Sequence, residues 1–481
     1  MSALWPVADL VKATGGIANG EWCAWRVEID SRKVQAGDLF VAIKGERFDG
    51  HDYVAQAFAN GAIAALVSRE LPIGGYQLLV ADTFKALDDL GKYNRARSHA
   101  KVVGITGSVG KTSTKEMLKL ALSAHGKTYA TSGNYNNHIG TPLNLANLPL
   151  DTQFAVFEMG MNHVGEIAHL TCMVRPHIAL ITGVEAVHLE FFASLEEIAR
   201  AKAEIFEGFE DIVIPNECEE SCRAKTVKIP RQARDDTGIA IINSDQKYFA
   251  DIDYKKITFG VNEKSDCKLL SYKPTISGCD ISASVMGKKF DYKLAATGKH
   301  WAIISLSVLA VCDVLGLDVQ KSAEALAEFS EVDGRGRVVK INVSGGQALL
   351  IDDSYNASPA SMRAAFEKTD EIWQAQGKKG RKIALLGDML ELGETSSILH
   401  AKLAENLQAA GFDKVYTAGD LMLNLHNALP INMRFNHAKN WMDLLNIIQL
   451  KAQDVVLIKG SHGSKMYEVA DRLRKEIKNA V

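Results

Sequence analysis

A strand, a glycine-rich turn and a helix follow one another between residues 102 and 122, and this segment constrains the fold most strongly. Residues 102–106 read Val-Val-Gly-Ile-Thr and are predicted to form a buried strand, and the turn at 107–113 reads Gly-Ser-Val-Gly-Lys-Thr-Ser. Glycines in such a turn let backbone N–H groups converge on phosphate oxygens, and the following helix N-terminus adds partial positive charge. The order of elements predicts a phosphate-binding loop at the end of a strand in an α/β sheet.

Each residue type in this loop has a chemical task. Lys111 can reach terminal phosphates, and the hydroxyl of Thr112 can hold Mg2+. The strict motif would have glycine where Ile105 stands, so the loop is a variant with Gly107 three residues before Gly110. Gly-Lys-Thr could also merely open a helix, but the preceding strand favours ATP binding. The predicted nucleotide-binding residues are Gly107, Ser108, Val109, Gly110, Lys111, Thr112 and Ser113.

Alternating strand and helix patterns recur along most of the chain, and its 481 residues are more than one hydrophobic core usually serves. The pattern changes near Ser98 and again at the glycine and arginine cluster 333–337. We therefore predict an α/β protein of three domains. They are a small N-terminal α/β domain (1–99), a central P-loop ATPase domain with a parallel sheet (100–331) and a C-terminal Rossmann-like domain (332–481). The charged, aperiodic stretch 217–242 is predicted to be an exposed insertion.

Charge and hydropathy limit the classes of partner. The net charge of -3 provides no field for holding polyanions, so no nucleic-acid partner is expected. No stretch approaches about 18 consecutive apolar residues, so no membrane segment is expected. Seven scattered cysteines favour free thiols in a reducing compartment. These features predict a cytoplasmic protein, which we expect to be a monomer.

Two polar side chains follow predicted strands of the central domain. Glu158 ends the strand-like run 154–157, and His188 lies beyond the run 177–182. The carboxyl ends of parallel strands are where α/β proteins bind ligands, so Glu158 is a candidate for binding Mg2+, and His188 is expected at the same edge with its role left open. An acid at a strand end is often only solvated, and a lone histidine is often a core or surface residue. The phosphate loop upstream favours the metal role for Glu158.

Lys202 lies on the apolar face of a predicted helix. Ser194 and Glu197 match a capping box, and apolar residues at 195, 198 and 205 share the face of Lys202. A lysine there either extends to the surface or is partly buried with a lowered pKa. In the second case its amine could add CO2 and become a carbamate.

Polar residues also follow strands of the third region. Asp352-Asp353-Ser354-Tyr355-Asn356 comes directly after the run 349–351, and Lys459-Gly460-Ser461 follows 455–458. Because side chains alternate along a strand, only one of the two aspartates is expected to face the cleft. These residues are predicted to contact ligands from the opposite wall of the site.

The motifs together resemble those of the Mur ligases almost from end to end. The segments that carry the resemblance are DSRKVQAGDLFVAIKGERFDGHDYV (30–54), GITGSVGKTSTKE (104–116), SGNYNNHIGTPL (132–143), FEMGMNHVGEI (157–167), VHLEFFASLEEIARAKAEIF (187–206), IDDSYNASPASM (351–362), LLGDMLELGE (385–394) and IKGSHGSKM (458–466). DDSYNASPASM and GDMLELG are most similar to the members that couple D-alanyl-D-alanine to UDP-N-acetylmuramoyl-tripeptide for cell-wall peptidoglycan.

The resemblance implies roles for individual residues. It implies ATP and one or two Mg2+ ions as cofactors, with Thr112, Glu158 and His188 as metal ligands, and a carbamate on Lys202. Lys111, Lys202, His188 and Asn137 are implied to be catalytic, and Arg337 and Asp353 to contact the nucleotide. The implied substrate-binding residues are Ser31, Arg32, Lys44, Gly45, Asn134, Asn136, Tyr355 and Asn356.

The chain departs from the family pattern at three places. Gly298-Lys299-His300-Trp301 stands where the family has Gly-Arg-His-Asn, so an aromatic residue replaces an asparagine expected near adenine. His462 stands where arginine is frequent, and the insertion lies outside the pattern. Alternative functions are a sibling ligase that adds one amino acid, a folylpolyglutamate-synthase-like enzyme, and an ATPase switch that acts on a partner protein.

Overall fold

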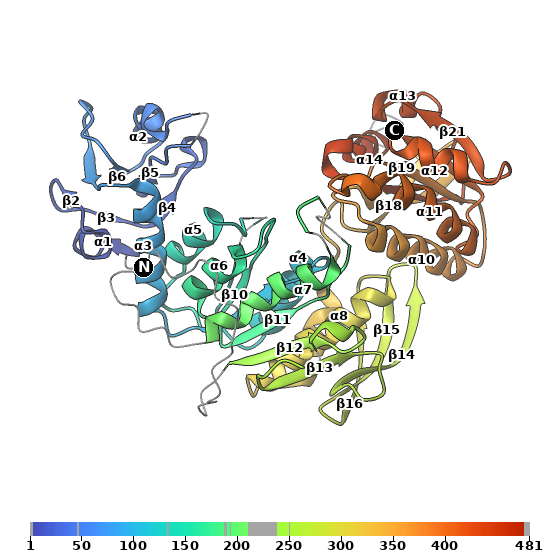
Figure 1. Ribbon diagram of the computed structural model, residues 1–481, viewed down its shortest axis with the longest axis horizontal. Coiled ribbons are helices and arrows are strands. Elements are labelled where there is room, and N and C mark those ends of the chain that lie inside the picture. The colour runs from blue at the N-terminus through green and yellow to red at the C-terminus, as the bar shows by residue number, and fades with distance from the viewer. Residues whose placement is uncertain are drawn as a thin grey trace.

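Three large β-sheets, each covered by helices, and one two-stranded sheet make up the computed structural model, which describes residues 3–45, 48–131, 133, 135–186, 190–192, 194–209, 238–249 and 251–475 (Figure 1). The sheets follow one another along the chain. Their arrangement agrees with the predicted α/β fold of three domains. The described helices include none long and apolar enough to cross a membrane.

The N-terminal sheet has five strands in the order β2-β7-β6-β5-β4. Four of them run parallel, and β2 pairs antiparallel with β7. The strands are β2 (Ile17–Ala18), β4 (Arg26–Glu28), β5 (Asp38–Val41), β6 (Ala64–Val67) and β7 (Tyr76–Leu79). The helices are α1 (Val7–Thr14), α2 (Val54–Ala59) and α3 (Thr83–Arg97), and β1 (Trp5–Pro6) pairs with β3 (Cys23–Ala24).

The central sheet has nine strands in the order β16-β15-β14-β13-β12-β11-β8-β10-β9. They are β8 (Lys101–Thr106), β9 (Thr128–Ala130), β10 (Phe154–Glu158), β11 (Ile178–Ile181), β12 (Ile239–Asn243), β13 (Lys256–Gly260), β14 (Cys267–Thr275), β15 (Gly278–Val285) and β16 (Lys288–Leu294). The helices are α4 (Lys111–Ser123), α5 (Gly140–Ala146), α6 (Glu166–Val174), α7 (Leu195–Ala203), α8 (Lys299–Val314) and α9 (Val319–Ala325).

Two sequence expectations for this domain need correction. The sheet is parallel only from β9 to β14, because β14, β15 and β16 form antiparallel hairpins that extend it. Residues 239–242 of the predicted insertion form most of β12, which is hydrogen-bonded to β11 and β13 inside the sheet. The charged sequence before this strand hid its short apolar run. The rest of the insertion, up to residue 237, lies outside the described residues.

The phosphate-loop strand β8 lies inside the sheet between β11 and β10, and both of its faces are buried. Val103 and Ile105 belong to the core under α4 and α8, and Val102 belongs to the core under α5 and α6. Alternation of apolar residues on both faces is what a buried parallel strand requires. The strand therefore holds the loop at its carboxyl end in a rigid position.

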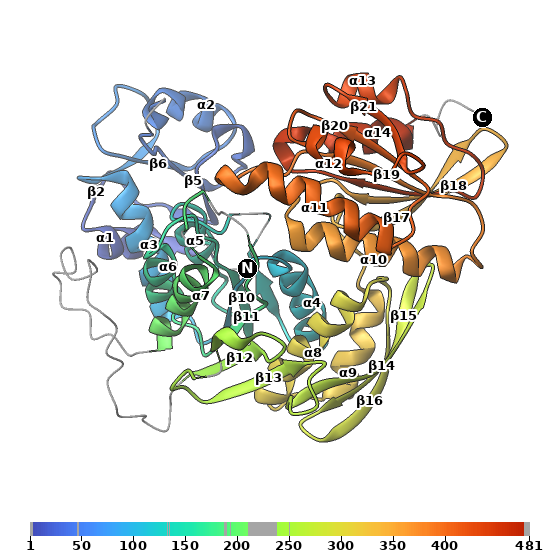
Figure 2. The same cartoon turned by 45° about the vertical axis from the view of Figure 1, so that its right-hand side comes forward.

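The C-terminal sheet has six strands in the order β17-β18-β22-β19-β20-β21, all parallel except for the β17–β18 pair. They are β17 (Arg337–Val343), β18 (Gly346–Asp353), β19 (Lys382–Gly387), β20 (Lys414–Ala418), β21 (Arg434–Ala438) and β22 (Val455–Lys459). The helices are α10 (Pro359–Ala375), α11 (Ser396–Ala409), α12 (Met422–Ala428), α13 (Trp441–Leu445) and α14 (Met466–Lys475). In both views, α10 lies next to the ends of β14 and β15 of the central domain (Figure 2).

Candidate active site

A cavity of about 1120 Å³ lies between the central and C-terminal domains. The central domain contributes the phosphate loop, the strand end at Glu158 and the first turns of α8. The C-terminal domain contributes the linker 334–336, the segment after β18 and Lys459. Predicted site residues that line the cavity are Ser108, Val109, Gly110, Lys111, Thr112, Ser113, Asn136, Asn137, Glu158, Asp353, Tyr355 and Asn356.

Close packing gives the phosphate loop its shape. Gly107 and Gly110 have φ of +149° and +83°, which side-chain-bearing residues rarely adopt. A Cβ at Gly107 would collide with the hydroxyl of Thr182, and this hydroxyl donates to the carbonyl of Val109 at 2.6 Å. Thr182 therefore supports the loop from β11, a role that the sequence analysis missed because nothing marks one threonine after a strand.

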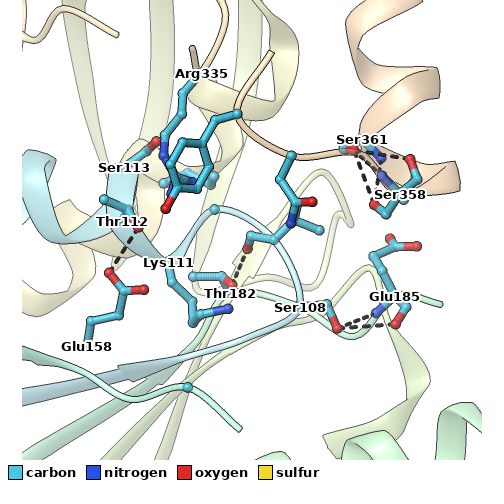
Figure 3. A pocket seen from close by; sticks show the side chains of 18 of the residues that line it. Ser108, Lys111, Thr112, Ser113, Glu158, Thr182, Glu185, Arg335, Ser358 and Ser361 are labelled. Carbon is cyan, nitrogen blue, oxygen red and sulfur yellow. Dashed lines mark hydrogen bonds between the residues drawn. The ribbon is translucent and has the colours of Figure 1, made fainter. Parts of the chain in front are cut away.

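Lys111, Thr112 and Glu158 converge at the start of α4 (Figure 3). The Thr112 hydroxyl donates to Oε2 of Glu158 at 3.0 Å, and the Asn136 amide donates to Oε1 at 2.8 Å. Glu158 is only 2% exposed, so these two donors stabilise a buried carboxylate. Burial lowers the pKa of Lys111, and the charge of Glu158 opposes that shift. Nζ of Lys111 donates to the Gly107 carbonyl at 2.7 Å.

Lys202 is 2% exposed, which favours the buried alternative over a surface position. Ser194 caps α7 by accepting from the Glu197 N–H at 3.2 Å, so this half of the predicted capping box is present. Burial, and next the positive charge of Lys111, lower the pKa of Lys202 well below 10.5. No described carboxylate forms an ion pair with it. A buried lysine of this kind is partly neutral and nucleophilic.

The C-terminal wall carries the charges expected at strand ends. Asp353 accepts from Nζ of Lys459 at 2.6 Å, and Lys459 also donates to the Asn356 carbonyl at 2.9 Å. Asp353 lines the cavity, whereas Asp352 is buried and accepts from the Gly334 N–H at 3.2 Å. Alternation along β18 therefore separates the two aspartates as expected.

The linker arginine that faces the phosphate loop is Arg335 and not Arg337. Arg337 begins β17, is half exposed and pairs with Asp333 at 2.6 Å, and it does not line the cavity. Arg335 lines the cavity, stacks on the ring of Tyr355 at 4.2 Å and lies close enough to Lys111 to lower its pKa (Figure 3). Gly334 and Gly336, with φ of +75° and +95°, turn the chain on either side of it.

Several other predicted residues lie elsewhere or have local partners. Asn137 lines the cavity, and its Oδ1 also accepts from the N–H of Gly140, the first residue of α5, at 2.9 Å. Ser31, Arg32, Lys44 and Gly45 lie in the N-terminal domain and do not line this cavity. There Ser31 donates to Gln56 at 2.7 Å and Arg32 pairs with Asp30 at 2.8 Å. His188 and Asn134 lie outside the described residues. The roles predicted for all of them remain predictions.

The cavity also contains residues that the sequence analysis did not assign as ligand contacts. Glu185 lines it, and burial raises the pKa of this carboxyl group. His300 and Trp301 line it from α8, with ring centroids 4.3 Å apart. Burial, and next the charges of Lys368 and Lys459, lower the pKa of His300 to about 3, so its imidazole is neutral. In the sequence, only the likeness of residues 298–301 to a family motif could have indicated that His300 and Trp301 line the cavity.

The oxygen atoms near Lys111 fit a small divalent cation. Mg2+ prefers hard oxygen ligands, and Glu158 and Thr112 supply a carboxylate and a hydroxyl beside the phosphate loop. Among described residues, no three His, Cys, Asp or Glu side chains form a ligand cluster. Phosphate and water oxygens usually complete the coordination of Mg2+ at nucleotide sites.

Comparisons with known proteins place this geometry in one family. The chain matches the models of the Mur ligase family catalytic domain (residues 26–96), the Mur ligase middle domain (105–234) and the Mur ligase glutamate ligase domain (334–462). It is 37% identical to the UDP-N-acetylmuramoyl-tripeptide–D-alanyl-D-alanine ligase of Rickettsia prowazekii, covering 97% of this chain and 99% of the relative. The Escherichia coli enzyme of the same name is 35% identical, with 93% of each chain covered.

Solved structures of MurF ligases superimpose on this chain over nearly its whole length. The crystal structure of MurF from Acinetobacter baumannii superimposes with a TM-score of 0.81 at 30% identity, covering 98% of this chain and 99% of that one. MurF ligase from Thermotoga maritima in complex with ADP superimposes with a TM-score of 0.75 at 28% identity, covering 95% and 98%.

Proposed function

Because this chain belongs to the Mur ligase family, we propose that it joins D-alanyl-D-alanine to UDP-N-acetylmuramoyl-tripeptide with conversion of ATP to ADP and phosphate. The product is UDP-N-acetylmuramoyl-pentapeptide, a precursor of cell-wall peptidoglycan. The observation that carries the proposal is the likeness to ligases of this name over 97% of the chain. The cavity also supports the proposal, because the phosphate loop faces charged residues of the C-terminal domain across it. Such a site can activate one substrate beside another.

The proposed reaction has two steps. The terminal carboxylate of the tripeptide attacks the γ-phosphorus of ATP, so that ADP leaves and an acyl phosphate forms. The amine of D-alanyl-D-alanine then attacks the acyl carbon, the peptide bond forms and phosphate leaves. Lys111 and Arg335 lie where they can offset the negative charge of the transferred phosphoryl group. The cleft between the domains limits the access of water to the activated acid.

We propose that Thr112 and Glu158 hold Mg2+, with His188 as a further ligand, which lies outside the described residues. The ion, when bound, supplies positive charge to the phosphate oxygens. One or two ions are expected. Without the ion, the hydrogen bond from Thr112 to Glu158 keeps the two oxygen donors close together. This preformed arrangement supports the assignment.

We also propose that Lys202 carries a carbamate derived from CO2. A lysine adds CO2 only through its neutral amine, and burial favours the neutral form. A carbamate has the charge and oxygen atoms of a carboxylate. It would place a negative charge near Lys111.

We assign the domains to residues 1–99, 100–331 and 332–481, because each described sheet is built within one of these ranges. The N-terminal domain is proposed to bind the UDP-muramoyl group through Ser31, Arg32, Lys44 and Gly45. We expect a monomer that acts in the cytoplasm, where ATP is available.

One assay tests the substrate assignment. Phosphate release is measured with UDP-N-acetylmuramoyl dipeptide and tripeptide, each with D-alanyl-D-alanine or with single amino acids. We expect release only with the tripeptide and the D-alanyl dipeptide together. Release with a single amino acid would identify a sibling ligase, and ATP turnover without any carboxylate and amine would indicate an ATPase switch.

The two linker arginines are expected to differ in effect. Arg335→Ala should lower kcat about 100-fold, because it removes one preorganised charge that faces the phosphate loop. Arg337→Ala is the matched control and should change kcat by less than about twofold, because an exposed ion pair with Asp333 contributes little. Phosphate release measures both. The assignment of Arg335 is wrong if Arg337→Ala has the larger effect.

A further inference from the structure

The hydroxyl of Tyr272 connects three segments that are far apart in the sequence. Tyr272 lies on β14 of the central domain and donates to Oε2 of Glu371 on α10 of the C-terminal domain at 2.6 Å. The same oxygen accepts from the Gly298 N–H at 2.9 Å. The contact lies where α10 approaches the ends of β14 and β15 (Figure 2). One side chain thus touches both domains that form the cavity.

Gly298 precedes the first turn of α8, whose residues His300 and Trp301 form one wall of the cavity. It is the N-cap of α8 with φ of +133°, and a Cβ there would lie 2.6 Å from the His300 ring. His300 and Trp301 follow in the first turn and line the cavity. One turn further, Ile304 touches the phosphate loop, because a Cβ on Gly110 would lie 2.8 Å from its Cδ1. The N–H held by Tyr272 therefore sets where this turn begins.

Glu371 is tied to the interdomain linker through α10. Lys368, one turn earlier, is 2% exposed and donates to Oε1 of Glu331 and to the Gly336 carbonyl, both at 2.6 Å. Residues three apart share a helix face, so Lys368 and Glu371 bind the linker and the central domain from the same face of α10. A shift of α10 would therefore move the Glu371 carboxylate to which Tyr272 donates.

The chemistry of the contact explains why a tyrosine stands there. Burial raises the pKa of the Glu371 carboxyl group, and the hydrogen bond from Tyr272 opposes the shift. A phenol can donate to a carboxylate and accept from an N–H at once, which phenylalanine cannot. Hydrogen bonds to charged groups are among the stronger ones in proteins.

We propose that Tyr272 is a positioning residue for nucleotide binding, because its hydroxyl aligns the first turn of α8 with α10 of the C-terminal domain. The inference rests on the proposed function, in which ATP occupies this cavity. Tyr272 does not line the cavity, so it acts through Gly298 and the wall that follows.

The test is steady-state kinetics of the full-length protein, by phosphate release, with each of the three substrates varied in turn. Tyr272→Phe is expected to raise KM for ATP about tenfold, in line with loss of a hydrogen bond to a charged group, and to change the other two KM values less than about twofold. Glu371→Leu should act similarly, and Glu371→Gln, whose amide oxygen still accepts, should stay near wild type. The double variant Tyr272→Phe/Glu371→Leu should be no worse than Tyr272→Phe, because Tyr272→Phe already removes the contact that Glu371→Leu removes.

Tyr292→Phe is the matched control, because the Tyr292 hydroxyl also bonds to α8, at Ser305 (2.6 Å), but does not reach the C-terminal domain. It should leave KM for ATP within about twofold of wild type, since it removes a core contact away from the cavity. An equal rise of KM for ATP in both phenylalanine variants, or an unchanged KM in Tyr272→Phe, overturns the inference. A wild-type protein that releases no phosphate with the three substrates overturns the proposed function instead.

Discussion

Lys111→Ala is expected to lower kcat by about 10³-fold, the largest effect of a single substitution in this protein. Lys111 is the cation of the phosphate loop, beside the Glu158 and Thr112 oxygens. The alanine variant lacks a charge that offsets the charge on the transferred phosphoryl group. Phosphate release with saturating substrates measures the loss.

A stability measurement separates catalysis from folding in this variant. Burial disfavours the charge of Lys111, and its charge also lowers the pKa of Lys202, so its removal should not lower the thermal unfolding temperature. Lys119→Ala, an exposed lysine on the same helix, is the matched control and should retain full activity. A large drop in unfolding temperature for Lys111→Ala would mean that the lost activity reflects misfolding.

Lys202→Ala is expected to lower kcat about 100-fold, the upper end of the range over which supporting groups of a metal site act. If the lysine carries a carbamate, short acids such as formate or acetate should restore part of the activity by supplying a carboxylate at the same place. Arg200→Ala, an exposed basic residue on the same helix, should remain active and should not respond to the acids. Near-normal activity of Lys202→Ala that added acids do not change would contradict the carbamate.

The lowered pKa of Lys202 also predicts how stability depends on pH when CO2 is excluded. Between that lowered pKa and 10.5, the unfolded chain binds more protons than the folded chain, so this residue makes the free energy of unfolding rise with pH. Lys202→Met removes the penalty of the buried amine. The stability that it gains over wild type should therefore shrink as pH approaches 10.5 and be largest at lower pH.

The sequence indicated the phosphate-binding side of the site more completely than the opposite wall. The turn at 107–113, Glu158 at a strand end and, on the opposite wall, Asp353 after another strand were all recognisable, and residues 108–113, Glu158 and Asp353 line the cavity. Lys202 was placed on an apolar face by its spacing, but spacing could not decide between surface and interior. That depended on α7 being packed against the central sheet, where its inner residues join the core.

The phosphate loop was determined by the sequence itself, because strand, glycine turn and helix are contiguous and glycine conformations are local. The position of a side chain relative to another domain is not determined by its neighbours in the sequence. Arg335 and Arg337 are two residues apart in one basic cluster, and only the packed linker decides that Arg335 faces the loop. Tyr272 and Glu371 are separated by 99 positions and meet only because the central and C-terminal domains pack at α10. Contacts of this kind depend on domain packing, which no short stretch of sequence encodes.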